Sequence, residues 1–207
     1  MVIPAYNEER TIGRVVKELI AYGPVLVAND CSTDHTARIA EESGAIVVSA
    51  EKNGGYDATV NLGFRKAVEL GASHIITFDA DGQHPAHQIP EFLRAFEMGA
   101  AAVVGVRPKM QRFSESIFSV FYRMRFGVSD PLTGMKGYDL RFYGRIGFFD
   151  SVRSIGTELL TRYLILGLAV KQIHIEVRER EDESRFGGAF RANFKILSAL
   201  GRVIRIN

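Results

Sequence analysis

The sequence predicts an α/β fold, in which a mostly parallel sheet is flanked by helices within a single domain. In the first half of the chain, short β-branched runs alternate with helical patterns, as in a succession of strand and helix units. The strand runs are apolar throughout, which is typical of parallel strands buried on both faces. The chain has 207 residues and shows no internal repeat or linker, so we expect one domain.

The first half of the chain, up to residue 106, contains the regular part of this pattern. The predicted strands are the apolar runs at residues 2–3, 25–28, 45–48, 74–78 and 101–104. The predicted helices occupy residues 11–21, 35–43, 56–70 and 88–98. The third helix has the clearest pattern, because Tyr56, Val60 and Phe64 recur at helical spacing and Gly71 follows as a stop.

After Val106 the alternation stops. We expect, in order, a helix within residues 107–127, a strand at 132–140, helices at 141–149 and 157–168, a strand at 170–180 and a basic amphipathic helix at 191–206. The first of these helices carries an apolar stripe formed by Phe113, Ile117, Phe121 and Met124. The last presents Phe194, Leu197, Leu200, Val203 and Ile204 on its apolar side. Core packing, an oligomer contact and a membrane contact are all compatible with the stripe.

The composition excludes several classes of protein. With 46% apolar and 24% charged residues, the chain resembles an ordinary globular protein rather than a fibrous or disordered one. Its single cysteine, Cys31, provides neither an internal disulfide nor a Cys-based zinc site, so we expect a reducing compartment. We expect no signal peptide, because the first residues contain neither a basic region nor a long apolar region. We expect no spanning helix, because the longest apolar run, residues 163–170, is far below the ~20 residues required. The expected location is the cytoplasm.

Positive charge is concentrated in two segments, although the formal net charge is only +2. Residues 184–207 contain five Arg or Lys and no acid, and residues 107–125 contain five against a single acid, Glu115. This distribution predicts either an anionic partner (a phosphate, a nucleic acid or a membrane surface) or a solvated helix face. Nucleic acid is the weakest of these, because no recognition motif is present. The glycine patterns of NAD and ATP sites are also absent.

Polar residues follow each of the first four predicted strands. These segments are residues 4–9, 29–32, 51–55 and 79–85. Because ligands of open parallel sheets bind at the carboxyl ends of the strands, we expect these segments to form one site. Asp79 and Asp81 are the strongest candidates, since two carboxylates on one turn can supply the oxygen ligands that Mg²⁺ or Mn²⁺ prefers. Aspartate is also common in turns, so the pair alone is a weak signal.

Considered together, these segments resemble the successive motifs of family 2 glycosyltransferases. The matching segments are residues 3–9, 29–36, 53–55 and 79–85. The sequence Asp-Ala-Asp-Gly-Gln-His-Pro at 79–85 is similar to that of dolichyl- or polyprenyl-phosphate hexosyltransferases, especially mannosyltransferases. Further on, Arg107, residues 130–136 and 158–160, Gly167, Arg180 and residues 184–185 match that branch in order. The resemblance is strong over residues 1–106 and moderate from there to about residue 188.

The resemblance implies a GT-A type, Rossmann-like fold and an inverting transfer from a nucleotide-diphosphate sugar, either GDP-mannose or a UDP-hexose. It also implies a divalent metal, Mg²⁺ or Mn²⁺. The implied nucleotide-sugar-binding residues are Pro4, Ala5, Tyr6, Glu8, Asp30, Asp79, Ala80, Arg180 and Arg185, and the implied metal ligands are Asp79, Asp81 and Gln83. Asp81 and Arg107 are the implied catalytic residues, with Arg107, Arg180 and Arg185 facing the diphosphate or the acceptor phosphate. The sequence departs from the family at Asn29 and Cys31, where many members have Asp and Gly.

The acceptor that the resemblance implies is a polyprenyl or dolichyl phosphate at the cytosolic face of a membrane. A lipid phosphate is already anionic at pH 7 and can attack without a strong base, whereas a hydroxyl acceptor would need one. Glu158 is the best candidate for such a catalytic base, although a Glu at a helix N-terminus is equally well explained by the helix dipole. The alternative acceptor is a polysaccharide or another hydroxyl compound. A non-catalytic nucleotide-sugar-binding protein is a remote alternative.

We divide the expected domain into a nucleotide-sugar-binding half at 1–106, an acceptor-side half at 107–188 and a C-terminal basic helix at 189–207. The expected partners are the sugar donor and a lipid-phosphate acceptor, with peripheral membrane association and a homo-oligomer as further expectations. His84 and His87 could extend the metal site, but we interpret them as part of a turn in which the rings face the solvent.

Overall fold

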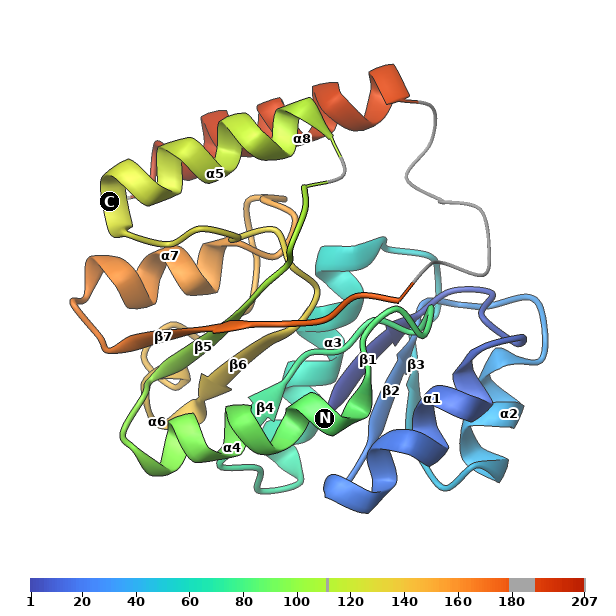
Figure 1. Ribbon diagram of the computed structural model, residues 1–207. Helices are drawn as coiled ribbons and strands as arrows, with labels where there is room; N and C mark the ends of the chain where they lie inside the picture. Colours follow the sequence, from blue (N-terminus) through green and yellow to red (C-terminus); the bar gives the residue numbers. More distant parts are fainter. Residues whose placement is uncertain (111, 179–188, 207) are drawn as a thin grey trace.

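Seven strands form the centre of the structure, a computed structural model that describes residues 1–110, 112–178 and 189–206 (Figure 1). They are β1 (Val2–Ala5), β2 (Leu26–Asn29), β3 (Ile46–Ser49), β4 (His74–Ile76), β5 (Ala102–Val106), β6 (Lys136–Asp139) and β7 (Val170–His174). One sheet has the order β1-β2-β3 and the other has the order β4-β6-β5-β7. A parallel bridge between Val2 and Thr77 joins them, so β1 lies next to the end of β4.

Among the described strands, only β6 runs antiparallel to its neighbours, β4 and β5. The other pairs, within β1-β2-β3 and between β5 and β7, are parallel. The prediction of an α/β fold with a mostly parallel sheet is therefore confirmed. The strand predicted at residues 132–140 begins only at Lys136, because the preceding residues form a turn against the end of β4. There, Thr77 Oγ1 donates a hydrogen bond to the Gly134 carbonyl oxygen at 2.7 Å.

Helices cover both faces of the sheets (Figure 1). They are α1 (Ile12–Leu19), α2 (Thr36–Glu42), α3 (Tyr56–Glu69), α4 (Ile89–Glu97), α5 (Phe113–Phe126), α6 (Leu140–Tyr143), α7 (Glu158–Ile165) and α8 (Ala189–Val203), with short 3-10 helices η1 (Ile20–Tyr22) and η2 (Ala86–Gln88). Side chains of α1, α2 and α4 pack on one face, and those of α3, α5, α7 and α8 pack on the other.

The two faces carry separate cores because successive side chains of a strand point in opposite directions. Val2 and Val104 belong to the core on the side of α3, α5, α7 and α8. Their neighbours Ile3 and Val103 belong to the core on the side of α1, α2 and α4. Burial on both faces explains why these strands are apolar throughout, and it leaves their carboxyl ends as the place for polar residues.

Further predicted elements differ from the structure, among them the strand expected at residues 170–180, which ends at His174. The strand at residues 45–48 was expected to be buried on both faces, but β3 lies at the edge of its sheet and Ile46 is 43% exposed. An apolar run does not reveal strand order, which decides whether a strand is central or at an edge. The helix expected at residues 141–149 is limited to α6, because a turn at residues 144–146 follows it and ends at Gly147, which has a φ of 81°.

Helices α5 and α8 lie side by side at the top of the molecule in Figure 1. Near their first turns, Ser114 Oγ donates a hydrogen bond to Asn193 Oδ1 at 2.5 Å. Their inward side chains, such as Phe118 and Ile196, are buried. Their outward apolar side chains form what we call the α5–α8 apolar surface: Phe113, Ile117, Val120, Met124, Phe190, Phe194, Leu197 and Ile204. Much of the predicted stripe, and of the apolar side predicted for the last helix, is therefore exposed rather than part of the core.

None of the helices in the described part of the chain is long and apolar enough to cross a bilayer.

The close approach of α3 to β1 depends on a glycine. A Cβ atom at Gly63 would lie 2.5 Å from Val2 Cγ1, closer than carbon atoms in a folded protein can approach. The helix therefore rests directly on the strand, which brings its N-terminus to the strand ends where the polar segments meet.

We expect Gly63→Val to lower the melting temperature by several degrees. Overpacking of a core costs about 1–3 kcal/mol, and each kcal/mol corresponds to about 2–4 °C for a domain of this size. Gly201→Val in α8 is the matched control, because a Cβ atom there would meet no described atom within 4 Å. Differential scanning calorimetry of both variants measures the effect, and equal melting temperatures would contradict the packing described for α3.

Candidate active site

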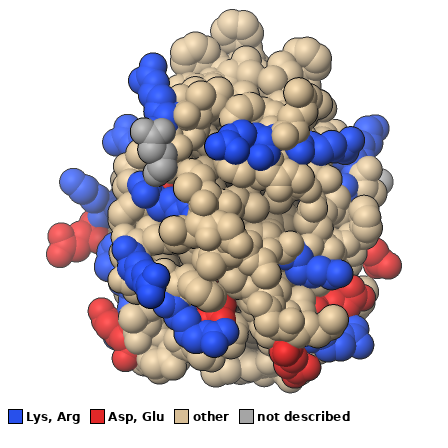
Figure 2. Space-filling view, turned by 90° about the vertical axis from the view of Figure 1, so that its left-hand side faces the viewer, with Lys and Arg blue, Asp and Glu red and all other residues tan. Residues whose placement is uncertain are grey.

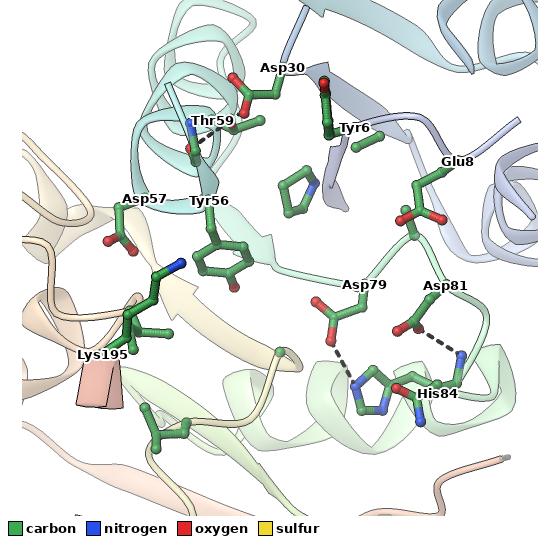
Figure 3. Close-up of a pocket in the computed structure, with 18 of the residues that line it drawn as sticks. Tyr6, Glu8, Asp30, Tyr56, Asp57, Thr59, Asp79, Asp81, His84 and Lys195 are labelled. Carbon is green, nitrogen blue, oxygen red and sulfur yellow. Dashed lines mark hydrogen bonds and ion pairs between the residues drawn. The ribbon is translucent and has the colours of Figure 1, made fainter. Parts of the chain in front are cut away.

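A cavity of about 660 Å³ opens at the carboxyl ends of β1, β2, β4 and β5 (Figure 3). Ten of the residues predicted from the sequence line it: Pro4, Ala5, Tyr6, Glu8, Asp30, Asp79, Ala80, Asp81, Gln83 and Arg107. Residues distant in the sequence are thus brought to one place by the parallel strands, as expected for an open α/β sheet. Arg180 and Arg185 lie outside the described residues.

The loop after β1 is tied to the loop after β2 through side chains. The backbone N–H of Glu8 donates to Thr36 Oγ1 at 2.7 Å, and that of Thr33 donates to Asn7 Oδ1 at 2.8 Å. Asn7 has a φ of 54°, a left-handed conformation that Asn tolerates better than most residues. These contacts hold the loop in place while Tyr6 remains 39% exposed at the rim of the cavity.

Asp30, at the end of β2, organises the loop that leads into α3. It is buried, and its carboxylate oxygens accept hydrogen bonds from the N–H groups of Gly54 at 2.7 Å and Gly55 at 2.9 Å. Gly55 has a φ of 78°, which favours glycine at this turn. A carboxylate offers about four acceptor positions. Asp30 can therefore hold the loop and still accept a hydrogen bond from a ligand in the cavity.

Asp79 and Asp81 lie on the turn after β4 (Figure 3). Asp79 Oδ2 lies 3.4 Å from Nε2 of His84, whose side chain is only 3% exposed. Burial raises the pKa of the Asp79 carboxyl, but the hydrogen bond and charge of His84, with the charges of Arg107 and Lys136, outweigh this and hold the pKa below its usual value. The interpretation of His84 as a solvent-facing ring was wrong, because the ring packs inward beside Asp79 and against Phe78.

Gly134 supports Asp79 from the other side. A Cβ atom at this position would lie 1.9 Å from Asp79 Oδ2 and 2.4 Å from Oδ1, so only a glycine leaves room for the carboxylate. The carbonyl oxygen of Gly134 is held by Thr77, which precedes Asp79 by two residues. The position of Asp79 is therefore set by the loop before β6 as well as by its own strand.

The side-chain oxygen atoms on this turn suit a divalent cation that is also bound by a ligand. Asp81 Oδ1 accepts the N–H of Gln83 at 3.0 Å, and Gln83 Nε2 donates to the Arg178 carbonyl at 3.4 Å. Both side chains carry oxygen atoms, the ligand type that Mg²⁺ and Mn²⁺ prefer. Among the described residues, no group of three or more His, Cys, Asp or Glu is arranged to hold a metal alone. Mg²⁺ in phosphate-binding sites commonly uses one or two carboxylates together with substrate phosphates. The residues present therefore fit a metal that is bound with a diphosphate.

Arg107, at the end of β5, is fixed by two acidic side chains. Its Nε and Nη2 atoms donate to Asp130 at 2.7 and 2.9 Å, and Nη2 lies 3.1 Å from Glu115. Burial lowers the pKa of Arg107, but the contacts with Asp130 and Glu115 outweigh this effect and raise it. Paired with two carboxylates, the guanidinium is a rigid part of the cavity wall.

Several lining residues were not predicted. Tyr56 and Asp57 come from the first turn of α3, and Lys195 comes from α8, more than a hundred residues away in the sequence (Figure 3). The Gly-Gly turn before Tyr56 could have predicted that Tyr56 and Asp57 line the cavity, because such a turn lets the backbone pass close to a ligand at the strand ends. Lys195 carried no such signal, since only helix packing brings α8 to the cavity.

Glu158 was predicted as a catalytic base, and the structure does not support this role. It is fully buried at the first turn of α7 and does not line the cavity. Its carboxylate accepts hydrogen bonds from the N–H of Ser151 at 2.6 Å and from Arg162 Nη2 at 2.7 Å. Burial raises its pKa, but these partners outweigh the effect and lower it. Glu158 therefore ties the segment at Ser151 to the first turn of α7, outside the cavity.

Comparison with solved structures identifies the fold. Glucosyl-3-phosphoglycerate synthase from Mycobacterium tuberculosis, in complex with Mn²⁺ and UDP-glucose, is similar with a TM-score of 0.78 and 20% identity, covering 100% of this chain and 79% of that one. The same enzyme in complex with Mn²⁺, UDP and phosphoglyceric acid gives a TM-score of 0.75 at 20% identity, covering 100% of this chain and 78% of that one. The fold is that of GT-A type glycosyltransferases.

The chain belongs to glycosyl transferase family 2, whose model matches residues 1–153. A dolichyl-phosphate hexose transferase of Haloferax volcanii is 29% identical over 91% of this chain and 88% of the relative. An undecaprenyl-phosphate mannosyltransferase of Micrococcus luteus is 28% identical over 90% of this chain and 86% of the relative. The resemblance seen in the sequence motifs is thereby confirmed.

Asp57 makes the stability of the folded protein depend on pH. Burial and the nearby charge of Asp150 raise the pKa of Asp57 from 3.8 to about 6, against an opposing hydrogen bond from the N–H of Gly156 at 2.8 Å. Because the folded-state pKa is the higher one, the native protein binds the proton more tightly. Asp57 therefore reduces stability as the pH rises through this interval.

We expect Asp57→Asn to raise the melting temperature relative to wild type at pH 8 and to have little effect at pH 4. A pKa difference of about two units corresponds to at most roughly 3 kcal/mol, or several degrees. Thermal melts across this pH range measure the difference, with the exposed residue Glu91 changed to Gln as the control. A difference from wild type that does not vary with pH would contradict the raised pKa.

Proposed function

We propose that this glycosyltransferase transfers a hexose, with inversion, from GDP-mannose or a UDP-hexose to a polyprenyl phosphate. The observation that carries the proposal is a single cavity that joins the loops after β1 and β2 to the Asp79–Asp81 turn and to Arg107. The relatives named as lipid-phosphate transferases favour the same substrates. Residues 1–106 would then bind mainly the donor, and residues 107–188 would form the acceptor side.

The nucleoside would bind between the loops after β1 and β2. Tyr6 offers an exposed ring at the rim, on which a base can stack. Asp30 offers carboxylate oxygens that can accept hydrogen bonds from the base or the ribose. Because both loops are held by hydrogen bonds before any ligand binds, little ordering would accompany donor binding.

The diphosphate would bind beside Asp79 and Asp81, with Gln83 as a further oxygen ligand to the cation. When bound there, Mg²⁺ or Mn²⁺ neutralises the negative charge that develops on the departing diphosphate. Arg107 supports the same end of the cavity with a guanidinium already held by Asp130. Preorganised charges of this kind stabilise a transition state without rearrangement during the reaction.

A phosphate acceptor is consistent with the absence of Glu158 from the cavity, because an ionised phosphate oxygen needs no base to attack the sugar. The alternative, a hydroxyl acceptor, is favoured by one observation. Asp57 lines the cavity, and its pKa is raised to about 6 by burial and by Asp150, which suits a general base near neutral pH. A hydroxyl acceptor would therefore use Asp57 rather than Glu158.

The protein would reach a lipid acceptor by lying on the membrane through the α5–α8 apolar surface. Phe190 is 86% exposed and Phe194 is 70% exposed. Exposing two aromatic side chains to water is unfavourable and unusual for a helix that faces only solvent. Exposed arginines border this surface: Arg123, Arg125, Arg191, Arg202 and Arg205. In Figure 2, which views the molecule from its left-hand side in Figure 1, the top is mostly tan and Lys and Arg side chains lie in a band below it. Apolar burial and attraction to anionic lipids would act together there.

We expect Asp81→Asn to reduce hexose transfer at least about 100-fold, a loss typical of removing one electrostatic contact to the transition state. The change should also abolish the Mn²⁺-dependent part of the increase in melting temperature that GDP or UDP causes. Folding should be preserved, because an Asn oxygen can still accept the N–H of Gln83. A donor screen with GDP-mannose and UDP-hexoses, with Mn²⁺ or EDTA, measures these effects.

The exposed residue Glu51, changed to Gln, is the control for this experiment. Activity of Asp81→Asn close to that of wild type in buffer with Mn²⁺ would refute the proposed metal site. An equal thermal shift with Mn²⁺ and with EDTA would argue that the nucleotide binds without a bridging cation.

We expect the protein to sediment with vesicles that contain phosphatidylglycerol at low salt and to be released at high salt. The double variant Phe190→Ser, Phe194→Ser should lose this binding without loss of thermal stability, because both side chains are exposed. Met98→Ser is the matched control, since Met98 is 85% exposed next to α4, on the opposite face of the sheets. Absence of wild-type binding at low salt would refute membrane association.

A further inference from the structure

A second cavity, of about 440 Å³, lies beside the first and has a different character. Three cationic residues line it, Arg107, Lys109 and Arg178, together with the apolar side chains of Pro108, Met110 and Val177. No Asp or Glu is among its described lining residues. This combination suits a ligand that carries an anionic group next to a hydrocarbon segment.

The two cavities meet at the catalytic end of the first. Gln83, Arg107 and Val177 line both of them. The junction is held together by the backbone, because the N–H of Arg178 donates to the Gln83 carbonyl at 2.8 Å. A group bound in the second cavity would therefore lie next to the turn that carries Asp79 and Asp81, which is where a second substrate has to approach the sugar.

The three cations are not equivalent. The charge of Arg107 is balanced by Asp130 and Glu115. The guanidinium of Arg178 lies 3.3 Å from Glu18, although that pair is partly exposed to solvent. Lys109 is exposed and forms no ion pair with any residue that the structure describes. Lys109 is thus the lining residue whose positive charge is least balanced by carboxylates among the described residues, so it would attract an incoming anion most strongly.

The chain also connects this cavity to the α5–α8 apolar surface. Met110 lines the cavity, and three residues later α5 begins with Phe113, which is 77% exposed. An apolar chain attached to a phosphate in the cavity would leave it next to side chains that can cover it. The cavity and the apolar surface together match an amphiphile rather than a small hydrophilic anion.

We propose that the second cavity binds the acceptor, with Lys109 and Arg178 on its monophosphate and with Pro108, Met110 and Val177 on the first carbons of its hydrocarbon chain. This inference rests on the proposed transfer to a lipid phosphate and identifies where that substrate binds. An ionised phosphate oxygen attacks the anomeric carbon and forms a new carbon–oxygen bond. The bond from that carbon to the donor diphosphate breaks, and its electron pair leaves with the nucleoside diphosphate. No proton has to move.

Direct binding tests the site without turnover. The full chain is titrated with farnesyl phosphate, farnesol or inorganic phosphate, without donor, by isothermal titration calorimetry. We expect farnesyl phosphate to bind most tightly and Lys109→Ala to weaken it about tenfold, as for loss of one charge-assisted hydrogen bond. Lys109→Glu should weaken it further. Lys171→Ala, at an exposed lysine of β7 that does not line the cavity, should leave affinity unchanged.

Turnover provides the second measurement. With a polyprenyl phosphate as acceptor, Lys109→Ala should raise the KM for the acceptor about tenfold and leave the Kd for GDP or UDP with Mn²⁺ unchanged. Unchanged affinity for farnesyl phosphate in Lys109→Ala would overturn the inference, and so would inorganic phosphate that binds as tightly as farnesyl phosphate.

The two proposals fail differently. If the wild type transfers a hexose to polyprenyl phosphate and Lys109→Ala has the same KM, the acceptor site is wrong and the proposed function stands. If farnesyl phosphate binds in a Lys109-dependent way but receives no sugar from any donor, the site stands and the proposed function is wrong.

Discussion

The position of Asp79 depends on a contact with a piece of backbone that carries no side chain. At Gly134 a Cβ atom would lie 1.9 Å from Asp79 Oδ2, so the carboxylate occupies the space that a side chain would take. Four residues earlier in the same loop, Asp130 holds Arg107 with hydrogen bonds of 2.7 and 2.9 Å. One loop, which leads into the antiparallel strand β6, therefore positions both the carboxylate of Asp79 and the guanidinium of Arg107, which lines both cavities.

A buried lysine, Lys136, adds a positive charge next to the carboxylates of this region. Lys136 is 1% exposed, and its Nζ donates to the carbonyl oxygens of Pro131 at 3.0 Å and Gly156 at 2.6 Å. Burial lowers its pKa to about 8, against the charges of Asp130, Asp150, Asp79 and Asp57, so it remains largely protonated at neutral pH. Its positive charge helps to hold Asp79 ionised. Removing one partner from such a buried group leaves the others uncompensated, which is why the cluster behaves as one unit.

Much of the site was predictable because it follows from strand ends. The motifs that contain Tyr6, Asp30 and Asp79 each follow an apolar strand, and parallel strands place their carboxyl ends at one edge. The position of His84 was not predictable, because a histidine after a turn faces the solvent unless a partner such as Asp79 draws it inward. Glu158 shows the opposite error, since an acidic residue at a helix start gives the same sequence signal whether it faces a ligand or holds a neighbouring loop, as Glu158 holds Ser151.

The sequence by itself determined the α/β class, the boundaries of most helices and the family, because these depend on local periodicity and on motifs contiguous in the chain. The tertiary structure alone decided that β3 is an edge strand, that β6 inserts antiparallel between β4 and β5, and that Lys195 and Gly134 reach the cavity. It also decided which apolar residues of α5 and α8 face outward. Each of these depends on contacts between segments far apart in the sequence, and the energy of such contacts is set by packing in three dimensions, which a local pattern does not contain.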